Sequence, residues 1–72
     1  MDNKPLKVFG NTLKDLRVKR GMSQEGLAHQ AGIHRNYMGA VERGEKNVCL
    51  LNITKIGRAL GVTPAALLKN IR

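Results

Sequence analysis

Aromatic residues are almost absent from this sequence. Its 72 residues include no tryptophan, one phenylalanine (Phe9) and one tyrosine (Tyr37). Proteins that read RNA usually stack unpaired bases on aromatic side chains, so this composition disfavours an RNA-binding role. The core of so short a chain must come from Leu, Ile, Val, Met and Ala, which suits a set of packed helices.

Cysteine and long apolar runs are equally scarce. Cys49 is the only cysteine, which excludes a disulfide within the chain and fits a reducing cytoplasm. We expect its side chain to be a small hydrophobic part of the core. No apolar run approaches the ~20 residues that a membrane-spanning helix needs. The first residues, MDNKPLK, also lack the apolar centre of a signal peptide.

The sequence lacks the patterns that carry catalysis or metal binding. His29, His34 and Cys49 do not have the spacing of metal ligands, and no acidic ligand accompanies them. Ser23 has no adjacent base, and no glycine-rich phosphate-binding loop is present. We therefore expect no enzymatic activity, no cofactor, no metal and no small-molecule ligand.

What the sequence has in excess is positive charge. Thirteen Lys and Arg against five Asp and Glu give a formal net charge of +8. A field of that strength on a small domain favours a polyanionic partner. Nucleic acid is the first candidate. An anionic membrane is the second, but no segment sets Lys and Arg cleanly opposite the apolar face that lies in a membrane interface.

Apolar spacing and glycine stops divide the chain into an arm and five helices. Residues 1–8 are predicted to be a flexible basic arm, because Pro5 and the charges around it oppose regular structure. Ser23, and Thr63 followed by Pro64, are typical of helix N-termini, while Gly32 suits a left-handed stop. The predicted helices span residues 10–20, 24–31, 35–43, 50–60 and 64–72. No strand pattern is present, so residues 9–72 are predicted to form a compact all-α domain.

The stretch SQEGLAHQAGIHRNYMGAVERG, residues 23–44, contains two short helices joined by a tight turn. Ala28 is small where the two helices must cross closely, and Gly32 permits the sharp turn between them. Ile33, directly after the turn, is placed to fill the angle between the helices. Two short helices joined by a turn of this kind form a helix-turn-helix, whose second helix enters the major groove of DNA.

The sequence resembles the Cro/C1-type (Xre-like) helix-turn-helix family of phage repressors and small bacterial regulators over about four-fifths of its length. The residues that carry the resemblance are Gly21-Met22-Ser23-Gln24, Leu27-Ala28, Ala31-Gly32-Ile33, Val41-Glu42-Arg43-Gly44, the run Leu51 to Leu60, and Gly61-Val62-Thr63-Pro64. The segment HRNYMGAVERGEKN is similar to the recognition segment of controller proteins from restriction–modification operons. The resemblance implies a five-helix, lambda-repressor-like domain that binds double-stranded DNA.

The first residues of the second helix of the motif are the candidates for reading bases. Arg35 can bond the O6 and N7 atoms of guanine, and Asn36 can bond adenine. Tyr37 can touch a thymine methyl group. Each has an alternative role: a solvated surface charge for Arg35, a cap or phosphate contact for Asn36, and packing on the fold for Tyr37.

A second set of residues is expected to contact phosphates. Gln24 opens the first helix of the motif, where free backbone N–H groups can also face a phosphate, and the family uses this position for phosphate contact. Lys4 and Lys7 either track a phosphate or groove as part of the arm or belong to a disordered tail. The predicted phosphate contacts are Gln24, His34, Arg43, Lys46 and Asn47. The alternative for Arg43, Lys46 and Asn47 is a solvated loop, and the alternative for His34 is a weak N-cap of the second helix of the motif.

The resemblance further implies an ion pair and a dimer. The family commonly joins the positions of Arg17 and Glu42 in a partly buried ion pair. It also acts as a homodimer on palindromic operators, often in its own promoter. Leu67, Leu68 and Ile71 in the last helix are candidates for the dimer interface, unless they only close the core. The alternative function is an antitoxin-type module that binds a toxin protein as well as DNA.

Overall fold

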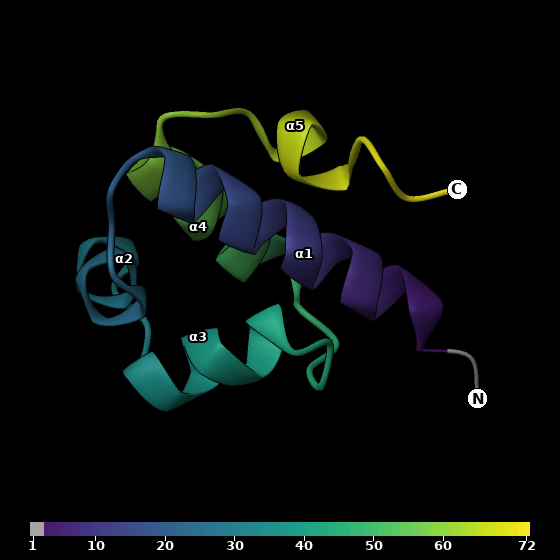
Figure 1. Ribbon diagram of the computed structural model, residues 1–72, viewed down its shortest axis with the longest axis horizontal. Coiled ribbons are helices and arrows are strands. Elements are labelled where there is room, and N and C mark those ends of the chain that lie inside the picture. The colour runs from purple at the N-terminus through teal and green to yellow at the C-terminus, as the bar shows by residue number, and fades with distance from the viewer. Residues whose placement is uncertain (1–2) are drawn as a thin grey trace.

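The computed structural model describes residues 3–72, which contain five helices and no strand (Figure 1). The helices are α1 (Lys4–Lys19), α2 (Gln24–Ala31), α3 (Arg35–Glu42), α4 (Leu50–Leu60) and α5 (Pro64–Leu68). The all-α prediction is therefore confirmed. None of these helices is both long and apolar enough to cross a lipid bilayer.

The first helix begins much earlier than the sequence suggests. It starts at Lys4, so the prediction of an arm over residues 1–8 and of a helix start near residue 10 is wrong for residues 4–8. Pro5 lies in the first turn, where a backbone N–H would have no helical partner, and its ring therefore costs the helix nothing there. The rest of the predicted arm includes residues 1 and 2, which lie outside the described residues.

The connection between α2 and α3 has the predicted turn chemistry. The Ser23 hydroxyl accepts a hydrogen bond of 2.9 Å from the Gly26 N–H and so caps α2. Gly32 ends that helix with φ 72°, a left-handed conformation that only glycine adopts at little cost. Ile33 follows, half-buried against the core. The angle between the two helices is thereby held by packing as well as by the backbone.

The core draws one fully buried side chain from each helix. Figure 1 shows α1 running across the molecule in front of α4, with α5 on one side and α3 on the other. Between them lie five side chains with no exposed area: Leu13, Leu27, Met38, Ile56 and Leu67. Burying a side chain of this size stabilises the fold by ~1.5–3 kcal/mol. Each helix is thus anchored to the same small core.

A close crossing holds α1 against α3 at Gly10. A Cβ atom built on Gly10 would lie 2.5 Å from the carbonyl oxygen of Glu42 and 2.6 Å from that of Val41. Neither distance is possible for a real side chain, so this crossing requires glycine. The apolar pattern of the sequence contains no sign of this requirement.

The C-terminal segment leaves the helical path sooner than predicted. Helix α5 ends at Leu68 and does not reach residue 72. The side-chain amide of Asn70 donates a hydrogen bond of 3.0 Å to the Thr12 hydroxyl on α1, and Ile71 packs against the core. These contacts fold the last residues back over α1, and both described ends of the chain lie toward the same end of the molecule (Figure 1).

The prediction for the single cysteine is wrong. Cys49 is exposed and occupies the N-cap position of α4, where its side chain makes no capping hydrogen bond. The residue directly precedes two leucines, and a run of apolar residues that long cannot all face one side of a helix. The core takes Ile53 and Ile56 from this part of the chain instead.

Candidate nucleic-acid interface

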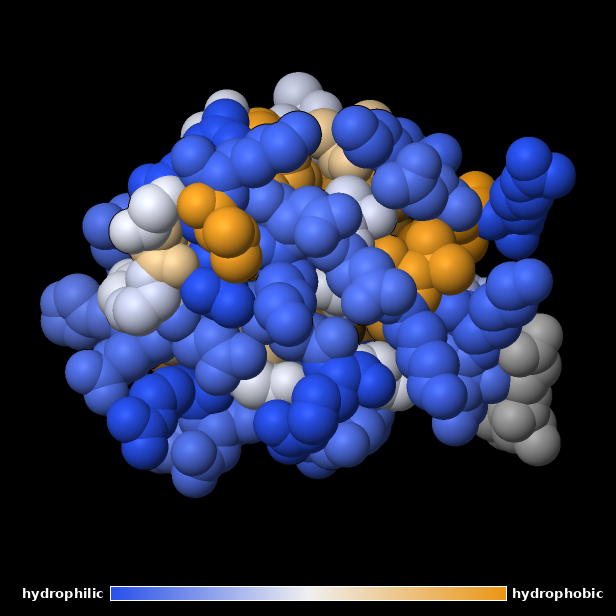
Figure 2. Space-filling view, in the orientation of Figure 1, coloured by the Kyte–Doolittle hydropathy of each residue, from blue (hydrophilic) through white to orange (hydrophobic). Residues whose placement is uncertain are grey.

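Helix α3 presents its N-terminal end to solvent and its other side to the core. Arg35 and Asn36 are exposed, whereas Met38, Ala40 and Val41 are buried. In Figure 2 the edge of the molecule formed by α3 is covered by hydrophilic residues. This is the arrangement that a recognition helix needs, because its first turns must reach the base edges while its other side stays attached to the protein.

The exposed end of α3 carries an ion pair that the amino-acid sequence did not lead us to expect. The Arg35 Nη1 atom lies 2.9 Å from Oε2 of Glu25, which belongs to the first turn of α2. Both side chains are largely exposed, at 62% for Arg35 and 72% for Glu25. The pair connects the N-terminal ends of the two helices of the motif. No pattern within either helix reveals it, because the contact depends on the angle at which the helices cross.

His34 and Asn36 begin α3 together. The His34 Nδ1 atom accepts a hydrogen bond of 3.1 Å from the backbone N–H of Asn36, so histidine does the work of the usual Ser, Thr or Asp cap. This bond occupies Nδ1, which leaves Nε2 as the ring nitrogen that can meet a phosphate. The Asn36 side chain remains exposed, and the helix cap is supplied by its neighbour and not by Asn36 itself.

Tyr37 packs on the fold, which is the alternative to base contact given above for this residue. Its ring is half-buried against the core, and its hydroxyl accepts a hydrogen bond of 3.2 Å from the side-chain amide of Asn52 on α4. The contact ties the recognition helix to α4. Tyr37 therefore has less freedom to approach a base than Arg35 or Asn36, and a thymine contact by its ring edge remains a prediction.

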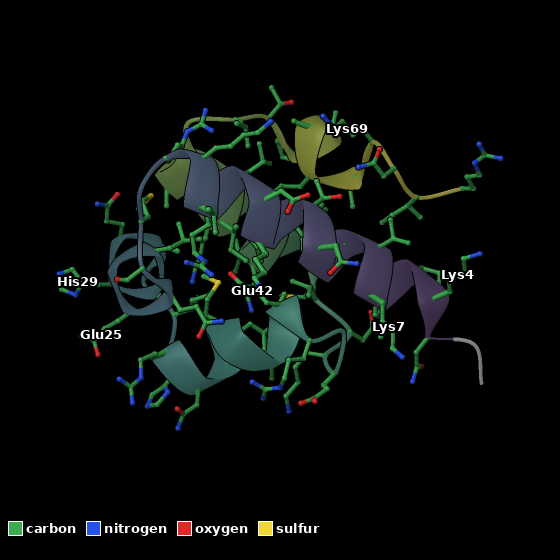
Figure 3. All side chains as sticks on the ribbon, viewed as in Figure 1. Lys4, Lys7, Glu25, His29, Glu42 and Lys69 are labelled. Atoms are coloured by element: carbon green, nitrogen blue, oxygen red, sulfur yellow. The ribbon has the colours of Figure 1, made fainter. Side chains whose placement is uncertain are left out.

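A buried network behind α3 joins three helices. The Arg17 guanidinium on α1 donates to both carboxylate oxygens of Glu42, at 2.6 Å from Nε and 3.1 Å from Nη2. Its Nη1 atom donates to the Met22 carbonyl at 2.7 Å. The expected ion pair is thus present and bidentate, with side-chain exposures of 11% and 3%. Figure 3 shows Glu42 in the centre of the molecule, between α1, α2 and α3.

Gln24 belongs to the same network. Its side-chain N–H₂ donates a hydrogen bond of 2.9 Å to Oε1 of Glu42. Gly39 lies beneath this side chain: a Cβ atom there would stand 3.4 Å from the Gln24 Oε1 atom. Glu42 therefore fixes the position of the side chain that opens α2, next to the N-terminus of that helix.

The loop after α3 carries the other predicted phosphate contacts. Arg43, Lys46 and Asn47 are all exposed there. Arg43 Nε lies 3.1 Å from Oε2 of Glu45, and this hydrogen bond raises the pKa of the arginine and lowers the pKa of the Glu45 carboxyl. Lys7 reaches the same place from α1, because its stem packs on Gly44. Basic groups from α1 and from this loop thus gather at the C-terminal end of α3.

The structure divides the three candidates for a dimer interface. Leu67 is fully buried within the chain, so its assignment to the interface is wrong. Leu68 is 36% exposed, and Ile71 is half-buried. The most exposed large apolar side chains among the described residues are instead Leu50 (73%) and Leu51 (63%), at the start of α4. The sequence does not reveal this exposure, because it depends on how α4 is rotated against the core.

These features together define a class: a DNA-binding helix-turn-helix domain with exposed Arg and Asn at the start of its recognition helix. The helix-turn-helix family matches residues 13–67, and the chain belongs to this family of transcription regulators. The predicted Xre-like membership is therefore confirmed. The prediction that the chain is not an enzyme agrees with the nature of the family.

Several similar proteins are controller proteins. The sequence is 46% identical over 69 residues to the control protein C.BamHI of Bacillus amyloliquefaciens, covering 94% of this chain and 85% of that one. It is 44% identical over 64 residues to the control protein C.MunI of a Mycoplasma species, covering 88% of this chain and 86% of that one. The crystal structure of the restriction–modification controller protein C.AhdI from Aeromonas hydrophila superimposes with a TM-score of 0.85. That match has 48% identity and covers 86% of this chain and 94% of that one.

Proposed function

We propose that this protein is a controller-type transcription regulator that binds a two-fold symmetric operator in double-stranded DNA as a homodimer, and that one such operator lies in its own promoter. One observation about α3 carries the proposal. Arg35 and Asn36 are exposed at the start of this helix, while Glu42 at its end is buried and hydrogen-bonded to Arg17 and Gln24. A regulator of this kind works in the cytoplasm, beside the genome. The similarity to C.BamHI, C.MunI and C.AhdI supports the controller role.

Arg35 and Asn36 are the base-reading residues of this proposal. Both are exposed on the first turn of α3, the part of a recognition helix that comes nearest to the bases. Arginine donates to two guanine acceptors at once, and asparagine pairs with adenine in the same bidentate way. Tyr37 contributes mainly by holding α3 on α4, with a thymine methyl within reach of its ring edge.

The phosphate contacts lie on both sides of these two residues. Gln24 and the N-terminus of α2 face one strand, and His34 offers its Nε2 atom near them. Arg43, Lys46 and Asn47 meet the backbone at the other end of α3. Phosphates are the same in every sequence, so these contacts set affinity and register, while Arg35 and Asn36 set the preference for a sequence.

The homodimer is needed because one recognition helix reads too few base pairs to select a genomic site. Two copies related by a two-fold axis place their α3 helices ~34–36 Å apart, on successive turns of the major groove. The exposed leucines at the start of α4, Leu50 and Leu51, are the best candidates for the shared surface, with Leu68 as a third. They replace Leu67, which the core uses. Val48 and Leu68 also line an apolar groove of about 160 Å³ that a second copy can cover.

The antitoxin alternative receives no support from the relatives named above, which are named as control or controller proteins and not as antitoxins. A toxin-binding module needs surface beyond the DNA-binding core. Most of the described residues belong to the five helices that pack on one core.

Selection of duplexes from a random library by the wild-type protein tests the proposal. A two-fold symmetric consensus is expected. Arg35→Ala and Asn36→Ala should each weaken binding to the selected duplex by ~1–3 kcal/mol while leaving binding to a scrambled duplex nearly unchanged. Arg43→Ala and Lys46→Ala should weaken binding to both duplexes and reduce the salt slope by ~1 unit each. Failure to select any sequence would refute the proposed function.

Light scattering tests the dimer. Leu50→Lys and Leu51→Lys should give folded monomers that bind the operator weakly, because a charge on the two-fold surface meets its own copy. Leu67→Ala is the matched control: it should lose ~2–5 kcal/mol of stability, as core leucines do, without acting through the interface. A wild-type protein that stays monomeric on its own operator would contradict the dimer.

A further inference from the structure

An acidic side chain stands at the DNA-facing edge of a strongly basic protein. The Glu25 carboxylate is 72% exposed at the start of α2, and Figure 3 shows this residue projecting outward from the helix. A carboxylate close to DNA is repelled by the phosphates of any duplex. A surface built only for affinity would be better without it. The reason for its presence must therefore lie in something other than affinity.

The partner of Glu25 is the proposed guanine reader. The single bond of 2.9 Å engages Arg35 through Nη1. A guanidinium has five N–H donors in a rigid plane, and guanine needs only two of them. The bond to Glu25 therefore leaves enough donors to read a guanine, and it limits the orientations that the flexible arginine side chain can take.

We propose that Glu25 is a specificity-determining residue of the DNA interface. It orients Arg35 toward guanine. Every duplex repels Glu25 to the same extent, but only at a cognate site does the oriented Arg35 gain base contacts that offset this repulsion. This inference rests on the proposed base-reading role of Arg35.

The chain contains a matched control in the pair formed by Arg43 and Glu45. This pair is also exposed, at 61% and 57%, and its two atoms lie 3.1 Å apart. Its arginine is proposed to contact phosphate, which every duplex presents. Neutralising Glu45 therefore removes one negative charge from the same edge of the protein without touching a base-reading side chain.

Two substitutions separate the effect of the negative charge of Glu25 from the effect of its side-chain length. Glu25→Gln removes the charge but keeps an oxygen that can accept from Arg35. Glu25→Asp keeps the charge, and the favourable acidic group in the first turn of α2, but is too short to hold Arg35 in the same place. Both variants should lose no more than ~1 kcal/mol of stability and remain fully folded at the temperature of the binding assay, which thermal melts check.

The experiment compares dissociation constants for the duplex that the wild-type protein selects and for a scrambled duplex. Glu25→Gln should bind the scrambled duplex about 2- to 3-fold more tightly, because the repulsion is lost. Binding to the selected duplex should change little, because the neutral amide holds Arg35 less firmly and this loss offsets the relief of repulsion. Glu25→Asp should bind the selected duplex about 3-fold more weakly, with little change on the scrambled one. Both variants thus lower the ratio of specific to non-specific binding. Glu45→Gln should tighten binding to both duplexes by about the same factor, about 2- to 3-fold, and leave the ratio unchanged.

A different pattern would overturn the inference. If Glu25→Gln tightens both duplexes equally, as Glu45→Gln does, and Glu25→Asp leaves the selected duplex unaffected, Glu25 is only a general charge. Arg35→Ala separates this failure from failure of the proposed function. If Arg35→Ala lowers the ratio and the Glu25 variants do not, Arg35 reads a base and the role of Glu25 alone is refuted. If Arg35→Ala leaves the ratio unchanged, the base-reading role itself is wrong.

Discussion

Two arginine–carboxylate pairs lie on opposite sides of the helix-turn-helix, and they differ in almost every physical respect. Arg17 and Glu42 are 11% and 3% exposed, share two hydrogen bonds, and are joined by the backbone of Met22 and the side chain of Gln24. Arg35 and Glu25 are 62% and 72% exposed and share one hydrogen bond. The first pair lies behind the recognition helix, and the second lies in front of it.

The difference suits the two pairs to different roles: structural support of α3 for the buried pair and, under the proposed function, base reading for the exposed one. A buried, fully hydrogen-bonded pair has a single arrangement, because breaking it leaves a charge without water or partner. An exposed pair exchanges partners at little cost, since water replaces whatever is lost. The buried pair can therefore fix the position of α3, while the exposed pair can release or redirect Arg35 when a base is presented.

The largest effect is expected from breaking the buried pair. Glu42→Ala leaves the Arg17 guanidinium buried without its main partner and should lower the free energy of unfolding by ~3–5 kcal/mol. Chemical denaturation of the variant measures this loss directly. An unfolding midpoint equal to that of the wild type would show that the pair has no structural role.

A double replacement tests whether the loss comes from the unpaired charge. Arg17→Met combined with Glu42→Leu removes both charges and fills the space with apolar groups. Replacing a whole buried pair is often neutral or stabilising, so this variant should be clearly more stable than Glu42→Ala. Equal instability of the two variants would point to packing and not to charge.

The next largest effect concerns the helix crossing that encloses the buried pair. Gly10→Ala places a methyl group against the carbonyl oxygens of Val41 and Glu42, and α1 must move away from the end of α3. We expect a loss of ~1–3 kcal/mol, as in other overpacked sites, measured by thermal denaturation. Gly26→Ala is the control, because its Cβ meets only the Ser23 hydroxyl and not a backbone atom. If Gly10→Ala and Gly26→Ala have the same thermal stability, the helix crossing tolerates a Cβ atom and the prediction is wrong.

The exposed pair should have a much smaller effect on folding. Arg35→Ala and Glu25→Ala are each expected to change the free energy of unfolding by no more than ~1 kcal/mol, and the change should shrink as salt is added. Denaturation at low and at high ionic strength measures both properties. A large, salt-independent loss would mean that this pair belongs to the fold in the same way as Arg17 and Glu42.

Local patterns predicted five helices, whereas most contacts between helices could not be predicted; the Arg17–Glu42 pair was expected only from the family resemblance. The caps at Ser23 and Thr63 and the stop at Gly32 depend on a few neighbouring residues, so they could be read from the sequence. The start of α1 could not be predicted from composition, because proline opposes the interior of a helix but is favourable in its first turn, where Pro5 lies. The pairing of Glu25 with Arg35 and the exposure of Leu50 depend on helix angles and rotations, which no single helix records.

The smallest effect concerns the third pair, at the far end of α3. The hydrogen bond from Arg43 lowers the pKa of the Glu45 carboxyl. A lowered folded-state pKa contributes stability above the pKa of the unfolded state, ~4.3 for Glu, and loses it as the pH falls through the folded value. A carboxyl titration by nuclear magnetic resonance should show the Glu45 pKa rising toward its ordinary value in Arg43→Gln. An unchanged pKa would mean that the two side chains do not hold each other in solution.

The position of Tyr37 has a practical consequence. It is the only tyrosine in a chain without tryptophan, and its ring sits half-buried on the recognition helix with its hydroxyl bonded to Asn52. Nearly all intrinsic fluorescence of the protein therefore comes from one fluorophore between α3 and α4. Its emission gives an unlabelled optical signal for unfolding, and the proposed function predicts that the same signal also changes when operator DNA is added.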